Sequence, residues 1–213
     1  MKDIAIYGAG GFGREVACLL KLINRKEAFW NLIGFFDDEY DIGFKTEYGS
    51  VLGGIDVLNS YNKPLCIVLA ICNPKALTSI ISAIKNTLID FPTIISPDAI
   101  FLDKETISIG KGNLISLGCN FSCNVTIGDF NSFYGSIGVG HDSHIGNFNS
   151  IMPAVRISGS VRIGDRNLFG TASVLLQKKI IGNDTVVGAN SLIIQNTKDG
   201  KTYFGNPARI INF

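Results

Sequence analysis

The chain of 213 residues contains only two histidines, His141 and His144. Asp142 follows His141, and a neighbouring carboxylate can fix the tautomer of an imidazole and raise its basicity. Cys123 lies eighteen residues before His141, and Gly159 lies eighteen residues after it. A general base beside a glycine amide that can hold an oxyanion provides the two groups that acyl transfer requires. We therefore predict His141, Asp142 and Gly159 as catalytic residues.

Two other chemistries use the same residue types. Cys123 beside His141 could form a thiolate that accepts the acyl group before passing it on. A thiol of low pKa needs electropositive surroundings, which one histidine and one aspartate do not supply, so direct transfer is favoured. A catalytic zinc site of the kind that carbonic anhydrases build on a β-helix needs three histidines. The chain has two, so we predict no metal.

The spacing of eighteen belongs to a repeat. The dipeptide Ile-Gly recurs every eighteen residues from Ile109 to Ile181, and every sixth residue from Ile109 to Ile193 is apolar. Small, β-branched or amide residues dominate the position two before it, and Lys179 is an exception. Six residues make a short strand and a corner, and eighteen make one closed coil that pairs with the next coil about 4.7–4.9 Å away. We predict a parallel β-helix of about five coils, in which residues eighteen apart stack.

Two details of this β-helix follow from the same pattern. The glycine after the apolar residue is expected beside the corner, where a positive φ and close backbone approach carry no steric cost. Phe130, Ile137 and Leu176 are expected to point outward, where exposed apolar side chains would favour a partner.

The first part of the chain has a different organisation. An apolar strand over Lys2–Tyr7 leads into the glycine-rich segment 8–13, a helix from Arg14 to about Arg25, and a second strand over Leu32–Phe36. Strand, GxGxxG, helix, strand and acidic residue is the Rossmann order, in which the loop and the helix N-terminus approach a phosphate. The alternative is that the glycines only make a tight turn.

The remaining elements before the β-helix are predicted from residue 43 onward. They are an irregular segment at 43–54, a short helix at 55–62, a buried strand at 64–72 and a helix at 73–88 with Asn73 as its N-cap. Three or four strands are half of a dinucleotide-binding domain, which favours a mononucleotide or nucleotide sugar over NAD. We predict an α/β Rossmann-like domain over 1–94 and an all-β domain over 95–213.

Composition excludes several classes of protein. The net charge is +1 with scattered Lys and Arg, which gives no electrostatic basis for binding nucleic acid. The longest apolar run, Leu65–Cys72, is too short to span a membrane, and no signal peptide is recognisable. Five cysteines without CxxC spacing are typical of reduced thiols in a cytoplasmic protein.

Taken together, these features resemble one family. A glycine-rich Rossmann-like domain, Asp37-Asp38 after its second strand, an uninterrupted hexapeptide repeat with His141-Asp142 and a terminal Gly-Asn-Pro-Ala-Arg at 205–209 are similar to the sialic acid O-acetyltransferase family. That family also contains nucleotide-aminosugar N-acetyltransferases such as the enzyme that makes UDP-diacetylbacillosamine. The resemblance implies a left-handed β-helix, a homotrimer, acetyl-CoA between adjacent β-helices, and a nucleotide sugar on the first domain.

The resemblance also implies roles for single residues. His141 is similar to the family's general base, Asp142 to its acidic partner, and Gly159 to the glycine whose amide holds the thioester oxygen. Positions that line the coenzyme A groove correspond to Ser150, Thr171, Ala189 and, in the tail, Arg209. Positions that hold the sugar nucleotide correspond to Gly10, Gly11 and Phe12 at the phosphates and to Asp37 and Asp38 near the nucleoside.

The chain departs from the family at four positions. Ser150 and Phe12 replace histidines found in relatives, Tyr134 stands where an asparagine is common, and Cys72 stands where relatives carry glycine. We predict an acetyl-CoA-dependent N-acetyltransferase that acts on a nucleotide-linked amino sugar. The alternatives are O-acetylation of a sugar hydroxyl, a catalytically silent nucleotide-sugar-binding trimer and, more distantly, a hydride-transfer enzyme.

Overall fold

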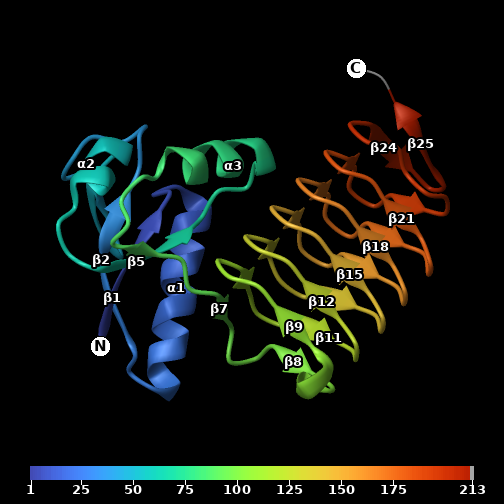
Figure 1. The fold of residues 1–213 in the computed structure, drawn as a ribbon, viewed down its shortest axis with the longest axis horizontal. Helices are drawn as coiled ribbons and strands as arrows, with labels where there is room; N and C mark the ends of the chain where they lie inside the picture. Colours follow the sequence, from blue (N-terminus) through green and yellow to red (C-terminus); the bar gives the residue numbers. More distant parts are fainter. Residues whose placement is uncertain (212–213) are drawn as a thin grey trace. The chain divides into compact units, whose positions relative to one another are not determined.

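The computed structural model describes residues 1–211 and divides into two compact units, Met1–Pro97 and a second that begins at Asp98 (Figure 1). The first unit contains a twisted sheet with the strand order β3-β4-β2-β1-β5-β6. β3 pairs antiparallel with β4, and the other pairs are parallel. The strands are β1 (Lys2–Tyr7), β2 (Trp30–Phe36), β3 (Lys45–Thr46), β4 (Gly49–Gly53), β5 (Leu65–Leu69) and β6 (Ile89–Asp90); β7 (Ile94–Ile95) ends the unit.

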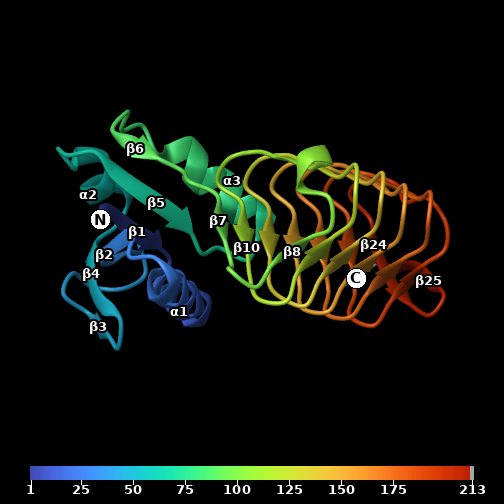
Figure 2. The same cartoon turned by 90° about the horizontal axis from the view of Figure 1, so that it is seen from below.

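Three helices connect these strands, and Figure 2 shows α1 on one side of the sheet and α2 and α3 on the other. They are α1 (Gly11–Lys26), α2 (Ile55–Ser60) and α3 (Pro74–Ala83). α1 buries an apolar stripe that includes Val16 and Leu20, at helical spacing. Asn73 caps α3 as predicted, because its side chain accepts hydrogen bonds from the Lys75 and Ala76 amides.

The structure differs from the sequence predictions in two segments of this unit. The segment predicted as irregular, 43–54, contains the β3–β4 hairpin, and β4 extends the sheet beside β2. The helix predicted to reach Leu88 ends at Ala83. Asn86 explains the early end, because its side-chain amide donates to the Leu58 and Tyr61 carbonyls and holds the following turn against α2.

The second unit is a parallel β-helix whose strands form three flat faces (Figure 1). The strands have two residues each, except for β24 and β25 at the end, which have four and pair antiparallel with each other. One face contains β10 (Leu114–Ile115), β13 (Ser132–Phe133), β16 (Ser150–Ile151), β19 (Leu168–Phe169), β22 (Val186–Val187), β24 (Thr202–Gly205) and β25 (Ala208–Ile211). The second contains β8 (Ile100–Phe101), β11 (Asn120–Phe121), β14 (Gly138–Val139), β17 (Arg156–Ile157), β20 (Val174–Leu175) and β23 (Leu192–Ile193). The third contains β9 (Ser108–Ile109), β12 (Thr126–Ile127), β15 (His144–Ile145), β18 (Arg162–Ile163) and β21 (Ile180–Ile181), preceded by the short helix η1 (Lys104–Thr106).

The repeat residues fill the core as predicted. Every sixth residue from Ile115 to Ile193 is buried, and Ile109, in the first coil, is half-buried. The register between paired strands is eighteen, as in Thr126 opposite His144 and His144 opposite Arg162. The predicted fold class, a Rossmann-like α/β domain followed by a parallel β-helix, is therefore confirmed.

A ladder of asparagines runs through this core. Asn113, Asn131, Asn149 and Asn167 are fully buried and stand eighteen residues apart. The side-chain oxygens of the first three accept from the main-chain and side-chain amides of the next asparagine, at 2.8–3.0 Å between Asn113 and Asn131. The Asn167 oxygen accepts from the Thr185 main-chain amide at 2.7 Å. Buried polar groups cost free energy unless they are paired, and stacking pairs them from coil to coil.

The predicted reason for the repeat glycines was partly wrong. Positive φ falls three residues after the inward apolar residue, on residues such as Asn124 and Asp142 that recur every six positions. The Ile-Gly glycines are instead required by close approach, because a Cβ on Gly128 would lie 2.5 Å from the Asn147 Oδ1 atom. That oxygen belongs to an outer ladder in which Asp129, Asn147, Asp165, Asn183 and Asp199 each accept from the main-chain amide one coil before.

The prediction of outward apolar residues was also partly wrong. Ile137 is fully buried because it stands two residues before Val139 and therefore shares the inward phase. Phe130 is 6% exposed and its ring stacks on Phe148 one coil later. Leu176 is exposed, as predicted.

We expect the asparagine ladder to stabilise the β-helix measurably. Asn149→Leu keeps the branched shape and the number of side-chain heavy atoms but leaves the Asn167 main-chain amide without its acceptor, so the free energy of unfolding should fall by about 2–4 kcal/mol. Chemical denaturation measures this loss. Asn120→Leu, on the exposed outer side of β11, is the matched control and should change stability by less than about 0.5 kcal/mol. Equal losses in the two variants would contradict a stabilising ladder.

Candidate active site

His141 and Asp142 form a corner of the β-helix between β14 and β15. Asp142 adopts a positive φ of 58°, and its amide donates to the Cys123 carbonyl of the preceding coil at 3.1 Å. The Ser160 amide of the following coil donates to the His141 carbonyl at 2.7 Å. We call this stack of three successive turns, residues 123–124, 141–142 and 159–160, the His141 corner.

The imidazole of His141 is oriented by Asp142. Nδ1 lies 2.7 Å from Asp142 Oδ2, and the two side chains are 60% and 51% exposed. The hydrogen bond from His141, followed by one from Asn124, holds the pKa of the Asp142 carboxyl below its ordinary value. An ionised carboxylate can only accept, so Nδ1 carries the proton and the lone pair of neutral His141 is on Nε2.

Gly159 faces this Nε2 atom. A Cβ built on Gly159 would lie 2.6 Å from His141 Nε2, so a larger residue there would displace the imidazole. The Gly159 carbonyl accepts from the Lys178 amide, and its own N–H has no acceptor among residues 1–211. The structure therefore places the Nε2 atom of His141 beside the Gly159 backbone.

Sequence reasoning missed one member of the His141 corner. The Asn124 side-chain amide donates to Asp142 Oδ1 at 3.1 Å, and the Asn124 main-chain amide donates to Thr106 Oγ1 at 2.9 Å. Thr106, Asn124 and Asp142 stand eighteen residues apart, so the period that located Gly159 also contained this signal.

The other two residues considered for chemistry occupy different positions. Cys123 is half-buried in the His141 corner, one coil before His141. His144 is exposed on the third face, in register with Thr126 and Arg162. It belongs to strand β15 and not to the His141 corner. Within residues 1–211, no three His, Cys, Asp or Glu side chains gather in a way that could hold a metal ion.

Of the four residues predicted for the coenzyme A groove, three are exposed and one is buried. Thr171 and Ala189 are exposed at one corner, where the Asn190 amide donates to the Thr171 carbonyl. Arg209, in β25, lines a hollow of about 340 Å³ together with Tyr203 and Lys198. Ser150, in contrast, is fully buried in the single chain.

The glycine-rich loop of the first unit contains glycines with different roles. Gly8 has a φ of 111°, and a Cβ on it would lie 2.8 Å from the Ala70 carbonyl oxygen. A Cβ on Gly13 would lie 1.8 Å from the Gly8 carbonyl oxygen, so this position accepts no side chain. A Cβ on Gly10 would meet nothing within 4 Å. Gly8 and Gly13 therefore shape the loop, while Gly10 keeps the space in front of it open.

That space is a hollow of about 450 Å³ at the carboxyl ends of β1 and β5. β1 is flanked by β2 on one side and by β5 on the other, so the strand order reverses direction at β1. The hollow therefore lies at the switch point, where open α/β sheets bind ligands. Its lining includes Gly10, Asp37, Asp38 and the exposed Cys72, whereas Gly11 and Phe12 do not line it.

Both aspartates of this hollow accept main-chain hydrogen bonds, Asp37 from the glycine-rich loop and Asp38 from the start of α2. Asp37 Oδ2 accepts from the Ala9 amide at 2.7 Å, and Asp38 Oδ1 accepts from the Ile55 amide at 2.8 Å. The buried Tyr7 hydroxyl donates to Asp38, and burial together with that hydrogen bond raises the pKa of the phenol. The carboxylates are thus fixed at the rim, where polar groups of a nucleoside could reach them.

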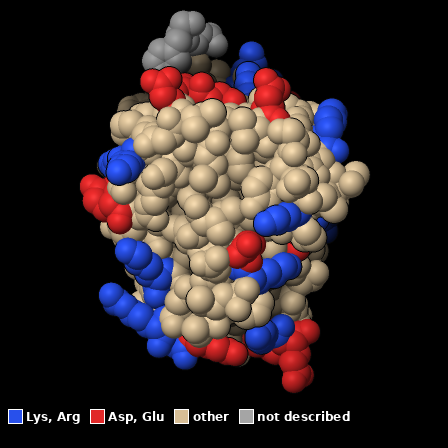
Figure 3. Space-filling view, turned by 90° about the vertical axis from the view of Figure 1, so that its left-hand side faces the viewer, with Lys and Arg blue, Asp and Glu red and all other residues tan. Residues whose placement is uncertain are grey.

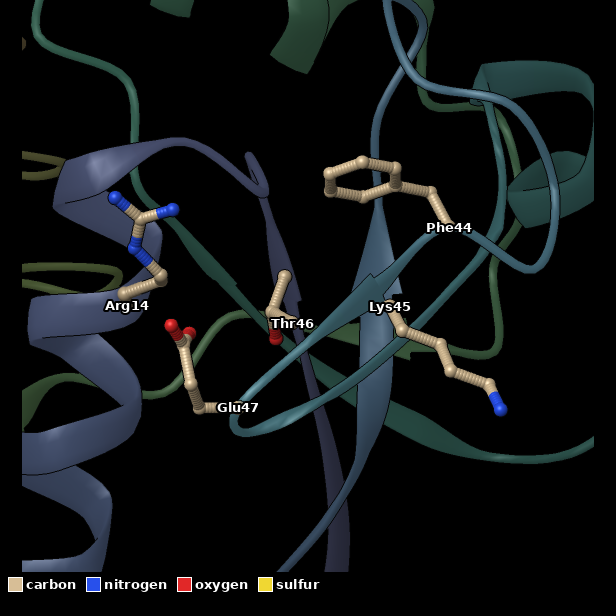
Figure 4. Close-up of a pocket in the computed structure, with 5 residues that line it drawn as sticks. All are labelled: Arg14, Phe44, Lys45, Thr46 and Glu47. Carbon is tan, nitrogen blue, oxygen red and sulfur yellow. The ribbon is translucent and has the colours of Figure 1, made fainter.

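A second hollow of the first unit, of about 500 Å³, lies between α1 and the β3–β4 hairpin. Arg14, Phe44, Thr46 and Glu47 line it. The Arg14 guanidinium is directed away from the Glu47 carboxylate, and the Lys45 side chain points away from the other four (Figure 4). One cation and one anion face this space, so its charge favours neither class of ionic ligand.

The surface agrees with the small net charge of the sequence. On the face shown in Figure 3, Lys and Arg are interspersed with Asp and Glu around an uncharged centre. None of the helices formed by residues 1–211 combines the length and apolar character needed to cross a membrane.

Comparison with known families and structures gives consistent matches. Residues 3–84 match the model of the PglD N-terminal domain. The acetyltransferase domain of PglB from Neisseria gonorrhoeae is 25% identical, with a TM-score of 0.90, over 99% of this chain and 100% of that one. WeeI from Acinetobacter baumannii is 26% identical, with a TM-score of 0.87, over 99% and 100%.

Two further structures contain bound ligands. The PglB domain in complex with acetyl coenzyme A is 26% identical, with a TM-score of 0.87, over 99% of both chains. PerB from Caulobacter crescentus, in complex with CoA and GDP-perosamine, is 21% identical, with a TM-score of 0.87, over 100% of this chain and 98% of that one, which shows a shared fold. No significant match was found among curated protein sequences.

The His141–Asp142 hydrogen bond predicts how the Asp142 carboxyl titrates. Its pKa should lie below the ordinary value, and His141→Phe should raise it, because the largest stabilising contact is lost. A group with a lowered pKa contributes stability that is present above its unfolded pKa and is lost as the pH falls through the folded one. Carboxyl-carbon NMR measures the titration. His144→Phe, which removes only a weak charge effect, should move it much less.

Proposed function

We propose that this chain, an acetyltransferase that resembles the nucleotide-aminosugar N-acetyltransferases over its whole length, acetylates the amino group of a nucleotide-linked sugar with acetyl-CoA. The observation that carries the proposal is the His141 corner, where the imidazole lies so close to Gly159 that a Cβ there would be 2.6 Å from Nε2. The match to an acetyl-CoA-bound domain supports the donor, and the match to PerB, solved with CoA and GDP-perosamine, is consistent with the class of acceptor.

The proposed reaction is a direct transfer without a covalent enzyme intermediate. The sugar amine attacks the thioester carbonyl, and the Gly159 amide donates to the oxygen that becomes negative. His141 Nε2 takes the proton from the attacking nitrogen, and Asp142 stabilises the resulting imidazolium through Nδ1. Collapse of the tetrahedral intermediate breaks the carbon–sulfur bond, and coenzyme A leaves as its thiolate.

The first unit is proposed to hold the nucleotide part of the acceptor. A diphosphate would face the glycine-rich loop at Gly10, where the N-terminus of α1 favours negative charge. Asp37 and Asp38 are proposed to lie near the nucleoside, with Gly11 and Phe12 at the outer side of the loop. The exposed thiol of Cys72 lies in the same hollow and would contact this ligand.

The acetyl-CoA groove is proposed to form between adjacent β-helices of a homotrimer. Thr171, Ala189 and Arg209 are exposed and can line such a groove, whereas the Ser150 side chain, buried in the single chain, is left out of it. Exposed apolar residues on the β-helix, including Leu117, Leu176 and Ile180, support an interface there.

Thiol release from acetyl-CoA tests the proposal directly. A panel of UDP-, GDP- and dTDP-linked amino sugars, with sialic acid and CMP-sialic acid added, should give release with at least one amino sugar. His141→Ala should lower kcat by roughly 10²–10⁴-fold, because the proton acceptor is lost, while acetyl-CoA affinity changes little. Calorimetric titration measures that affinity.

The outcomes of this assay separate the alternatives. Release with hydroxyl acceptors alone would show O-acetylation, and silence with tight nucleotide-sugar binding would show a non-catalytic binding protein. Near-normal turnover of His141→Ala would remove His141 from the mechanism. Cys123→Ala should keep most activity, and its complete inactivation with an intact fold would favour transfer through a thiolate.

We expect Gly10→Val to separate nucleotide-sugar binding from folding. A Cβ at residue 10 meets no protein atom within 4 Å, and the valine methyl groups would occupy part of the hollow, so nucleotide-sugar affinity should fall at least about tenfold with little change in the thermal midpoint. Acetyl-CoA affinity should be unaffected. Gly13→Ala is the structural comparison, because its Cβ collides with the Gly8 carbonyl and should destabilise the unit. Unchanged nucleotide-sugar affinity in Gly10→Val would contradict the proposed phosphate position.

A further inference from the structure

We propose that Asn124 is a positioning residue for the catalytic base: it fixes the carboxylate that orients His141. The inference deepens the proposed function and rests on it for its kinetic part. Asn124 contacts neither Gly159 nor the space in front of it, and acts through Asp142.

The hydrogen bonds of the His141 corner form one continuous series. The Thr106 hydroxyl donates to the Asp103 carbonyl and accepts from the Asn124 main-chain amide at 2.9 Å. The Asn124 side-chain amide then donates to Asp142 Oδ1 at 3.1 Å, and Asp142 Oδ2 accepts from His141 Nδ1 at 2.7 Å. The series starts at Thr106, the last residue of η1, and ends at the His141 imidazole, which faces Gly159.

The two oxygens of Asp142 therefore have separate partners. Asp142 is half exposed, and a carboxylate held at one oxygen alone would rotate and exchange its imidazole bond for water. A second donor at Oδ1 fixes the carboxylate plane and leaves Oδ2 aimed at Nδ1. Asn124 thus restricts the imidazole without touching it.

Stacking of the coils brings the amide into reach. Asn124 and Asp142 occupy the same corner position on successive coils, with φ values of 54° and 58°. The hydrogen bond between the Asp142 amide and the Cys123 carbonyl locks the two turns together. A side chain as short as asparagine can then span the distance between the coils.

An amide suits this position better than a carboxylate. Asparagine donates to ionised Asp142 without adding charge, whereas an aspartate would place two carboxylates in contact. The titratable groups around the imidazole are Asp142 beside it, Cys123 one coil earlier and His144 on the adjoining strand. A new negative charge at residue 124 would stabilise protonated His141.

Two substitutions test the role. Asn124→Gly keeps a residue that accepts positive φ but removes the amide. It should lower kcat about tenfold, leave both KM values and the thermal midpoint unchanged, and reduce the population of the Nδ1-protonated tautomer in ¹⁵N NMR. If Asn124 had only a structural role, Asn124→Gly would lower the thermal midpoint at most. The kcat and the tautomer population would then stay as in the wild-type protein.

Asn124→Asp reports on charge at the same position. The acid limb of the kcat/KM profile should move to higher pH by roughly half a unit to one unit, because the added carboxylate raises the pKa of the base. Histidine NMR follows the same titration without any substrate, and His144, the other histidine, is the internal reference and should move less.

The results distinguish the inference from the proposed function. If wild-type protein transfers no acetyl group but both variants change the His141 tautomer or titration as stated, the positioning role holds and the proposed function fails. If wild-type protein is active while Asn124→Gly retains its kcat and its tautomer population, the inference is overturned.

Discussion

The structure depends on a hydrogen bond that recurs at every corner of the β-helix. From Phe130 to Asn190, each non-glycine residue with positive φ donates its main-chain amide to the carbonyl nineteen residues earlier. For non-glycine residues this conformation costs about 1–2 kcal/mol each, and a hydrogen bond across coils offsets the cost only when the coils are stacked in register. The corners therefore stabilise one another through the stack, and the buried asparagines and the outer Asp/Asn ladder repeat the same constraint on either side of the backbone.

This rigid register gives the candidate site its precision. Asn124, His141 and Gly159 come from three successive coils, yet their relative positions are set by main-chain hydrogen bonds of 2.7–3.1 Å. A base on a loop would need packing from neighbouring residues to keep its orientation. At the His141 corner, the exposed imidazole is bonded to the Asp142 carboxylate, which in turn accepts from the Asn124 side-chain amide of the preceding coil. The first unit fixes its glycine-rich loop differently: Gly8 and Gly13 permit a tight turn, and Asp37 accepts a hydrogen bond from the Ala9 amide within it.

The period of eighteen is the reason why much of the fold was predictable from sequence. It assigned the inward residues and the stacking of His141 on Gly159, because both depend only on counting. It also contained the Asn124–Asp142 pair, which sequence reasoning overlooked by following the histidine position alone. Other features depend on tertiary contacts that counting does not provide: the burial of Ser150, the β3–β4 hairpin, and the steric reason for the Ile-Gly glycines, which lies in oxygen atoms of the following coil.

A stack with a fixed register also restricts how such a protein can change length during evolution. In a repeat architecture each coil contacts only its neighbours, so a whole coil can be gained or lost at the far end while the His141 corner stays intact. Insertion of one residue within a coil would instead move every later side chain to the wrong face. Lineages of this protein can therefore lengthen only in steps of eighteen residues or by loops that bulge from a corner, and the length of the stack beyond the His141 corner changes in the same discrete steps.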